Sequence, residues 1–143
     1  MKALLGAWQL WALLSAAFAA LTAIFAKVGV ENVNSDFATF VRTLVIICVL
    51  TLILTALGEW QSPAQVSRRT YTFLILSGLA TGASWICYFR ALKIGEASRV
   101  APIDKLSVVL VALFGVTLLG ERISLLNASG IALIAIGAVL VAI

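Results

Sequence analysis

Long apolar runs separated by short polar stretches make up the pattern of this chain. Three runs, at residues 3–26, 70–89 and 123–143, contain no charged residue. Each reaches the roughly 20 residues that a helix needs to cross the hydrocarbon core of a bilayer. Two more runs qualify if a few charges are tolerated, because residues 37–58 include Arg42 and residues 97–120 include Arg99, Asp104 and Lys105. The pattern predicts an all-α integral membrane protein with five transmembrane helices, at residues 3–26, 37–58, 70–91, 97–120 and 123–143.

The polar stretches between these runs are short, and none has the composition of a flexible linker. We therefore expect one five-helix transmembrane bundle over residues 1–143. Positive charges should collect on the cytoplasmic side of such a bundle. Here the loops on the two sides carry equal numbers of Lys and Arg, which indicates either insertion in both orientations or one orientation with a weak loop signal.

Composition narrows the range of functions. Hydrophobic residues make up 63% of the chain and charged residues 11%, whereas soluble domains carry about 25% charged residues. This excludes a soluble enzyme, a disordered chain and a nucleic-acid-binding protein, and it assigns the net charge of +4 to loops facing lipid headgroups. The chain has no histidine and no nucleotide-binding or hydrolase motif. We expect no enzyme activity, no cofactor and no metal site.

Three charged residues lie well inside the predicted spans, away from their ends: Arg42, Asp104 and Lys105. A charge at the centre of a membrane helix costs roughly 2.5–3.5 kcal/mol on insertion scales. In one interpretation these residues line a polar pathway and meet a charged substrate. In the other, Arg42 and Lys105 extend toward the headgroups while Asp104 pairs with Arg42 across helices. Because Asp104 and Lys105 are adjacent, we expect them to point in different directions.

Several uncharged residues have two interpretations each. Trp85 and Tyr88 form either one wall of a binding pocket or part of an aromatic belt at the membrane surface. Ser15 and Thr22 lie on a stripe of small residues in the first span, which lines a cavity or packs against another helix. Arg90 and Lys93 follow the third span, and we expect them to anchor its end.

Glycine and proline mark the later spans. Gly78 and Gly82 form a GxxxG pattern, and Gly130 and Gly137 share one face of the last span, so both sets indicate helix-packing surfaces. Pro102 lies within the fourth span. It removes a backbone donor and is expected to disturb the carbonyl one turn earlier, at Ser98.

The segment ALKIGEASRVAPI at residues 91–103, followed by LLGER at residues 118–122, resembles the EamA unit of the drug/metabolite transporter superfamily. The last span, with GIALIAIGAV at residues 130–139, is similar both to the last helix of that unit and to the dimerisation helix of the small multidrug resistance exporters. The resemblance is strongest over residues 91–139. It implies a transporter, and for members with a single unit it implies an antiparallel homodimer with a central cavity.

One departure from the small multidrug exporters bears on the substrate. Those proteins use a glutamate in the first helix to exchange protons for cations, and residues 3–26 contain no acid. Together Arg42, Asp104 and Lys105 carry a net positive charge. This favours a zwitterionic or anionic metabolite over a cationic drug, with Asp104 as a proton-linked or substrate-contacting acid.

The leading interpretation is therefore a homodimeric secondary transporter of small polar metabolites, working by alternating access in a bacterial inner membrane. The alternative is a small membrane subunit that transports nothing itself and assembles with a larger membrane complex, because a chain oriented by its partner also tolerates equal loop charges. The substrate, the coupling ion and the direction of transport are left open by the sequence.

Overall fold

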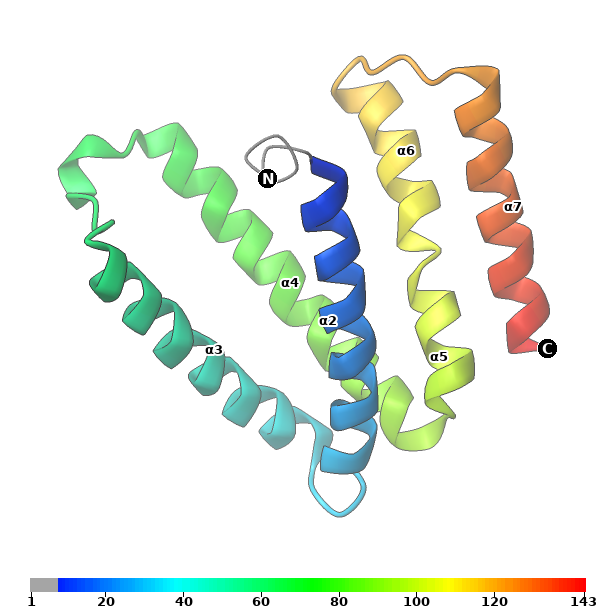
Figure 1. Cartoon of the computed structure of the whole chain (residues 1–143), viewed down its shortest axis with the longest axis horizontal. Helices are drawn as coiled ribbons and strands as arrows, with labels where there is room; N and C mark the ends of the chain where they lie inside the picture. Colours follow the sequence, from blue (N-terminus) through cyan, green and yellow to red (C-terminus); the bar gives the residue numbers. More distant parts are fainter. Residues whose placement is uncertain (1–7) are drawn as a thin grey trace. The chain divides into compact units, whose positions relative to one another are not determined.

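The computed structural model describes residues 8–143, and within that range it contains helices and no strand. In chain order the helices are α2 (Trp8–Gly29), α3 (Ser35–Leu57), the short 3-10 helix η1 (Pro63–Gln65), α4 (Arg68–Ile94), α5 (Ala97–Asp104), α6 (Ser107–Leu118) and α7 (Leu125–Ala142) (Figure 1). Together they give five stretches that are long and apolar enough to cross a membrane, α5 and α6 counting as one. The prediction of an all-α protein with five spans is confirmed.

The ends of α3 follow from local chemistry. Asn34 precedes the helix, and its side-chain oxygen accepts hydrogen bonds from the backbone N–H of Asp36 at 2.8 Å and of Phe37 at 3.2 Å. Such a cap satisfies donors that have no partner within the helix. At the other end Gly58 adopts φ 66°, a left-handed conformation that glycine reaches without steric cost. The helix thus begins two residues before the predicted boundary, at Ser35.

Helix α4 extends beyond its predicted range of 70–91 at both ends. It begins at Arg68, where the hydroxyl of Ser67 accepts a hydrogen bond from the backbone N–H of Thr70 at 3.1 Å, and it continues to Ile94. The end of the helix is held by Arg90 and Lys93, whose partners are Asp36 in the first turn of α3 and the carbonyl of Val33 in the loop before α3. The helix begins two residues before and ends three residues after the predicted bounds.

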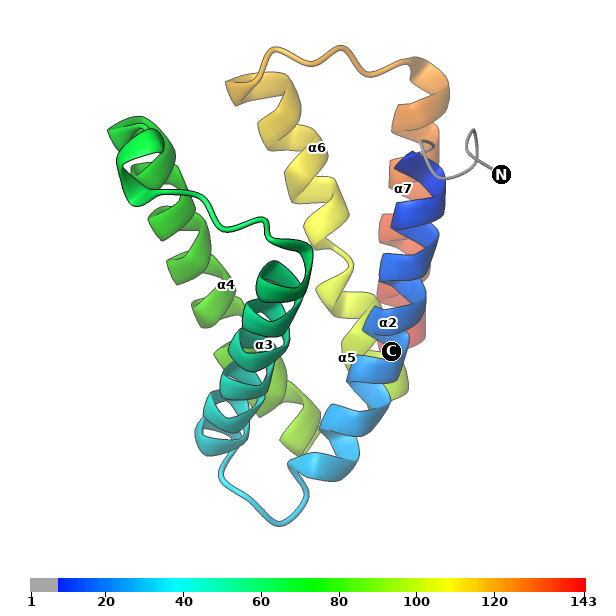
Figure 2. The ribbon, with the colours of Figure 1, turned by 60° about the vertical axis from the view of Figure 1, so that its left-hand side comes forward.

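The fourth span is not one continuous helix, which corrects the prediction of a single helix over residues 97–120. Helix α5 continues through Pro102 to Asp104, and α6 starts at Ser107 (Figure 2). Around the break the backbone N–H of Leu106 donates to the carbonyl of Ile103, and that of Val108 donates to the carbonyl of Lys105, each at 3.0 Å. These are the i to i−3 bonds of a 3-10 turn, which inside a helix often mark a hinge. The irregular hydrogen bonds lie after Pro102. The sequence had instead predicted a disturbed carbonyl one turn before it, at Ser98.

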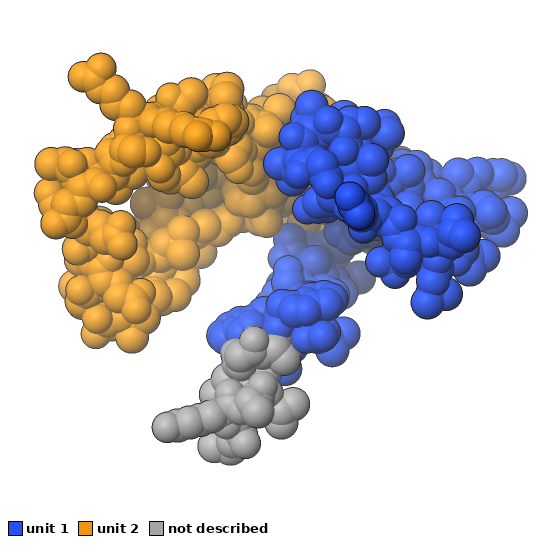
Figure 3. Space-filling model, turned by 90° about the horizontal axis from the view of Figure 1, so that it is seen from above, with its two compact units in different colours: residues 1–25, 94–143 blue, residues 26–93 orange. Residues whose placement is uncertain are grey.

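Two compact units make up the chain, coloured separately in Figure 3: residues 26–93 form one, and residues 1–25 with 94–143 form the other. In the unit of residues 26–93, Val30 and Leu92 are fully buried and Phe89 is 3% exposed. These three lie where the loop after α2 meets the end of α4. In the other unit α7 packs against both α5 and α6. Most other large apolar side chains are exposed, as expected for helices whose surroundings are lipid.

Candidate functional site

Arg42 lies inside α3 and stacks on aromatic rings of α4. Its guanidinium carbon is 4.1 Å from the ring centroid of Trp85 and 5.3 Å from that of Phe89. Trp85 and Phe89 are one helical turn apart, so they share a face of α4. Phe89 is buried, whereas Arg42 and Trp85 are half-buried. Tyr88, also half-buried, lies close enough to interact electrostatically with Arg42. The structure thus brings together Arg42, Trp85 and Tyr88, and adds Phe89, which sequence reasoning missed.

The depth of this cluster bears on the two interpretations of Arg42. The ion pair between Asp36 and Arg90 sets a common level for α3 and α4 at one end. From that level Arg42 is about 9 Å deeper along α3, and Trp85 is about 7.5 Å deeper along α4, at 1.5 Å per residue. The guanidinium is nearer to Trp85 than to Phe89, which is the shallower of the two. The side chain therefore stays near the level of its own backbone, and a role for Arg42 in a pathway stays a prediction.

Aromatic faces are the partners that Arg42 has in its own unit. Within residues 26–93 its guanidinium makes neither an ion pair nor a hydrogen bond. The acids of that unit are Glu31, Asp36 and Glu59, and all three lie at a helix end or in a loop. A cation on an aromatic face gains about 0.5–2 kcal/mol, and its N–H donors at the edge of the plane stay available. Such a guanidinium can accept a carboxylate or another planar anion in bidentate fashion.

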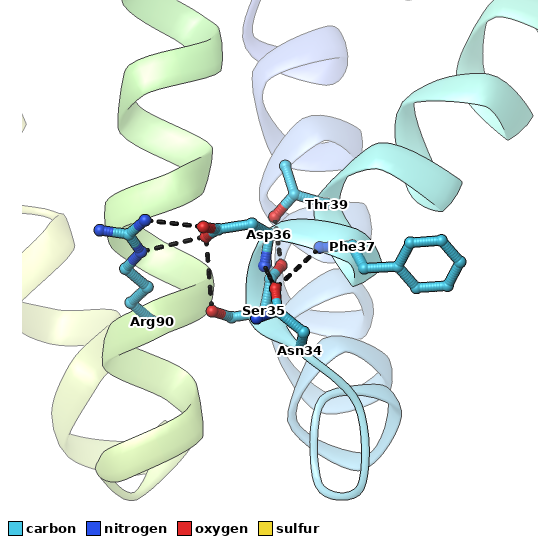
Figure 4. Close-up of polar contacts among 6 residues, drawn as sticks. All are labelled: Asn34, Ser35, Asp36, Phe37, Thr39 and Arg90. Atoms are coloured by element: carbon cyan, nitrogen blue, oxygen red, sulfur yellow. Dashed lines mark hydrogen bonds and ion pairs between the residues drawn. The ribbon is translucent and has the colours of Figure 1, made fainter.

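A set of polar contacts closes the end of this unit. The carboxylate of Asp36 accepts two hydrogen bonds from Arg90, from Nε at 3.0 Å and from Nη2 at 2.7 Å (Figure 4). Lys93 donates to the backbone carbonyl of Val33 at 2.6 Å, and Lys27 donates to that of Leu92 at 2.8 Å. Arg90 thus fastens the end of α4 to the first turn of α3, and Lys93 fastens it to the loop before α3. Anchoring of this end at the membrane interface stays a prediction.

Asp104 and Lys105 lie at the break between α5 and α6. The Lys105 ammonium nitrogen is 3.4 Å from Oδ2 of Asp104. The expectation that these adjacent side chains point in different directions is wrong. Adjacent residues diverge on a continuous helix, but α5 ends at Asp104, and the flexible stem of Lys105 folds back onto its neighbour.

For the remaining predicted site residues the structure gives exposure and surroundings but no contact that bears on their predicted roles. On α2, Ser15 is exposed and Thr22 is half-buried, and a role for either in a pathway stays a prediction. A Cβ added at Gly78, Gly82, Gly130 or Gly137 would meet no atom within 4 Å, so no close approach in the described residues requires glycine there. Their role in helix packing stays a prediction.

Gly115 shows the close approach that the other glycines lack. A Cβ there would lie 2.6 Å from Oε2 of Glu121, whose backbone N–H also donates to the carbonyl of Gly115 at 3.0 Å. Gly120, with φ 69°, makes the turn that brings Glu121 back over α6. The left-handed conformation at Gly120 gives the glycine of the Leu-Gly-Glu step a structural explanation, whereas the atom nearest to Gly115 is the end of a flexible side chain that can move.

Comparison with known proteins adds two findings. A model of the EamA-like transporter family matches residues 6–143. A protein of Sinorhizobium sp, named "Uncharacterized transporter in cobO 3'region", is 65% identical over 136 residues, which cover 95% of this chain and 96% of the relative. No solved structure matches the chain. The resemblance that was strongest over residues 91–139 therefore extends over nearly the whole chain.

Proposed function

This chain belongs to the EamA-like transporter family, and on that premise we propose that it is a secondary transporter of small zwitterionic or anionic metabolites. It works as an antiparallel homodimer by alternating access. The observation that carries the proposal is the guanidinium of Arg42, held on Trp85 and Phe89 inside an apolar helix pair with no acid partner among residues 26–93.

The energetics favour a ligand role for Arg42. A cation inside a membrane helix costs roughly 2.5–3.5 kcal/mol at the centre, and stacking on aromatic rings returns up to about 2 kcal/mol when the site is desolvated. A substrate carboxylate that pairs with the guanidinium offsets the remainder and gains a charge-assisted interaction. Arg42 therefore favours an anionic group on the substrate, whereas a cationic drug would be repelled.

The number of spans supports the proposed homodimer. A unit with five spans reverses orientation when it is duplicated and fused, which gives the inverted repeats of many secondary transporters. This chain holds a single unit, so a second copy in the opposite orientation supplies the missing half. The equal loop charges permit both orientations. The small-residue faces at Gly78 with Gly82 and at Gly130 with Gly137 offer surfaces for the second copy.

Transport by purified protein in proteoliposomes tests the proposal. Vesicles carrying the wild-type chain should take up radiolabelled zwitterionic or anionic metabolites from a mixed panel, and should leave quaternary ammonium compounds outside. Arg42→Gln should lower uptake at least tenfold. Arg69→Gln is the matched control, because Arg69 also lies over an aromatic ring, Phe73 at 5.9 Å, but at the start of α4. Uptake of hydrophobic cations alone, or equal uptake by both variants, would overturn the proposal.

Topology is tested separately. Single cysteines in the loop of residues 59–67 and at residue 143, in a chain with Cys48 and Cys87 replaced, can be labelled by an impermeant reagent in intact cells and then in opened cells. Labelling of each site partly from outside and partly from inside supports the antiparallel pair. Labelling from one side only would overturn it and would favour a parallel assembly or a separate partner chain.

A further inference from the structure

The break in the fourth span places two opposite charges at a helix end. Asp104 is the last residue of α5, where the helix dipole is negative, and Lys105 follows it directly. By the helical rise Asp104 lies about 10 Å inside the span that starts at Ala97. Broken helices with charged or polar groups at the interruption are a recurring way in which transporters build ligand sites. The position alone makes Asp104 and Lys105 candidates for contact with a transported molecule.

The two charges neutralise one another. Helix α7 packs against both α5 and α6, and it carries no titratable side chain. The nearest other charges on α5 are Glu96 and Arg99 at its start, which form their own ion pair at 3.4 Å. Within residues 94–143 the ion-pair partner of Asp104 is therefore Lys105.

The pair is loose. A charge-assisted hydrogen bond between an ammonium and a carboxylate has an ordinary length of about 2.7–2.9 Å, and this pair is at 3.4 Å. The side chains are 36% exposed for Asp104 and 56% exposed for Lys105, so the described residues enclose neither of them. Separating the charges without replacement is costly inside a span, since each would be left unpaired.

Charge balance then decides what can open the pair. An inorganic cation or an amine would satisfy Asp104 and leave the Lys105 ammonium unpaired. An inorganic anion or a simple carboxylate would satisfy Lys105 and leave Asp104 unpaired. A molecule that carries both an ammonium and a carboxylate satisfies both charges at once. We propose that the Asp104–Lys105 pair at the α5–α6 break is a recognition site for a small zwitterion, whose ammonium binds Asp104 and whose carboxylate binds Lys105.

This inference rests on the proposed function and makes its substrate class narrower. Arg42 favours any substrate with an anionic group, whether or not the substrate also carries an ammonium. The pair at the break requires both groups. The two proposals therefore separate on simple carboxylates, which the proposed function permits and the zwitterion site rejects.

Ligand-induced thermal stabilisation of the purified full chain provides the test. Three probe mixtures are compared at equal concentration: neutral L-amino acids, the amines that lack their carboxylates, and the carboxylic acids that lack their amino groups. The amino acids should raise the melting temperature, and the other two mixtures should not. Asp104→Asn and Lys105→Gln should each weaken the apparent affinity for the amino acids at least tenfold. Glu96→Gln, which breaks a pair of the same length at the start of α5, should leave that affinity unchanged.

The double variant Asp104→Asn with Lys105→Gln guards against misfolding, because it removes both charges and leaves neither unpaired. It should fold and lose its preference for zwitterions. Equal stabilisation by amines or carboxylates alone, or wild-type affinity in the double variant, would overturn the zwitterion site. Uptake of simple carboxylates that depends on Arg42 and not on Asp104 would overturn it and leave the proposed function standing. If no probe mixture stabilises the wild-type chain and no metabolite is taken up into vesicles, both the zwitterion site and the proposed function are overturned.

Discussion

Replacement of Arg42 by methionine separates a ligand role from a structural one. The substitution keeps an unbranched side chain between α3 and α4 and removes the charge. A guanidinium at this partial depth carries a burial cost of about 2–3 kcal/mol, below the value at the centre of a helix, and its stacking on Trp85 and Phe89 returns about 1–2 kcal/mol. We therefore expect Arg42→Met to unfold with a free energy about 1 kcal/mol higher than the wild-type chain, while transport falls at least a hundredfold.

The assay is equilibrium unfolding in mixed micelles by titration with sodium dodecyl sulfate, followed by tryptophan fluorescence and paired with uptake in proteoliposomes. Arg69→Met serves as the control and should change neither quantity appreciably, by less than about 0.5 kcal/mol in stability. A loss of more than about 1 kcal/mol in Arg42→Met, with transport reduced only in proportion to the folded fraction, would refute the reasoning. Arg42 would then be a structural anchor for α4.

Three further predictions concern the backbone and the aromatic wall. Gly120→Ala forces a Cβ into a left-handed conformation and should cost about 1–2 kcal/mol, measured by the same unfolding titration. Pro102→Ala restores a backbone donor beside the α5–α6 break, so it should raise the melting temperature and slow uptake several-fold. Faster uptake by this variant would contradict a hinge at this position. Trp85→Leu should weaken substrate affinity and lower stability by about 1 kcal/mol, whereas Trp85→Phe should retain most of both, as a full titration of each variant would show.

The spans could be predicted from the sequence because the bilayer imposes one simple rule. A helix that crosses it must hold about 20 apolar residues, and all five runs satisfy that rule. The ends were less predictable, since they depend on specific partners. Asn34 caps α3 through its side chain, and Arg90 and Lys93 hold the end of α4 through contacts with Asp36 of α3 and with Val33 in the loop before it, both far away in sequence. Hydropathy carries no information about such partners.

The candidate site could be predicted only as a set of residues. Arg42, Asp104 and Lys105 stand out because charges are rare in membrane helices. Their partners were not visible, since the stacking of Arg42 on Trp85 depends on the rotation of α3 against α4. One signal was available: Trp85 and Phe89 are four positions apart and so share a helix face. That spacing indicates one aromatic face on α4, but it does not show that Arg42 of α3 lies against it.

The break after Pro102 explains why reasoning from a regular helix misplaced Asp104 and Lys105. On a continuous α-helix neighbouring side chains diverge by about 100°, so the two charges would have needed separate partners. The interruption removes that constraint, and the pair neutralises itself at 3.4 Å. An ion pair between the two side chains lowers the free-energy cost of placing both charges inside a span. In our proposal a ligand that carries the same two charges replaces this pair. Arg42, by contrast, has no acid partner among residues 26–93, so its charge is balanced within that unit only by aromatic rings.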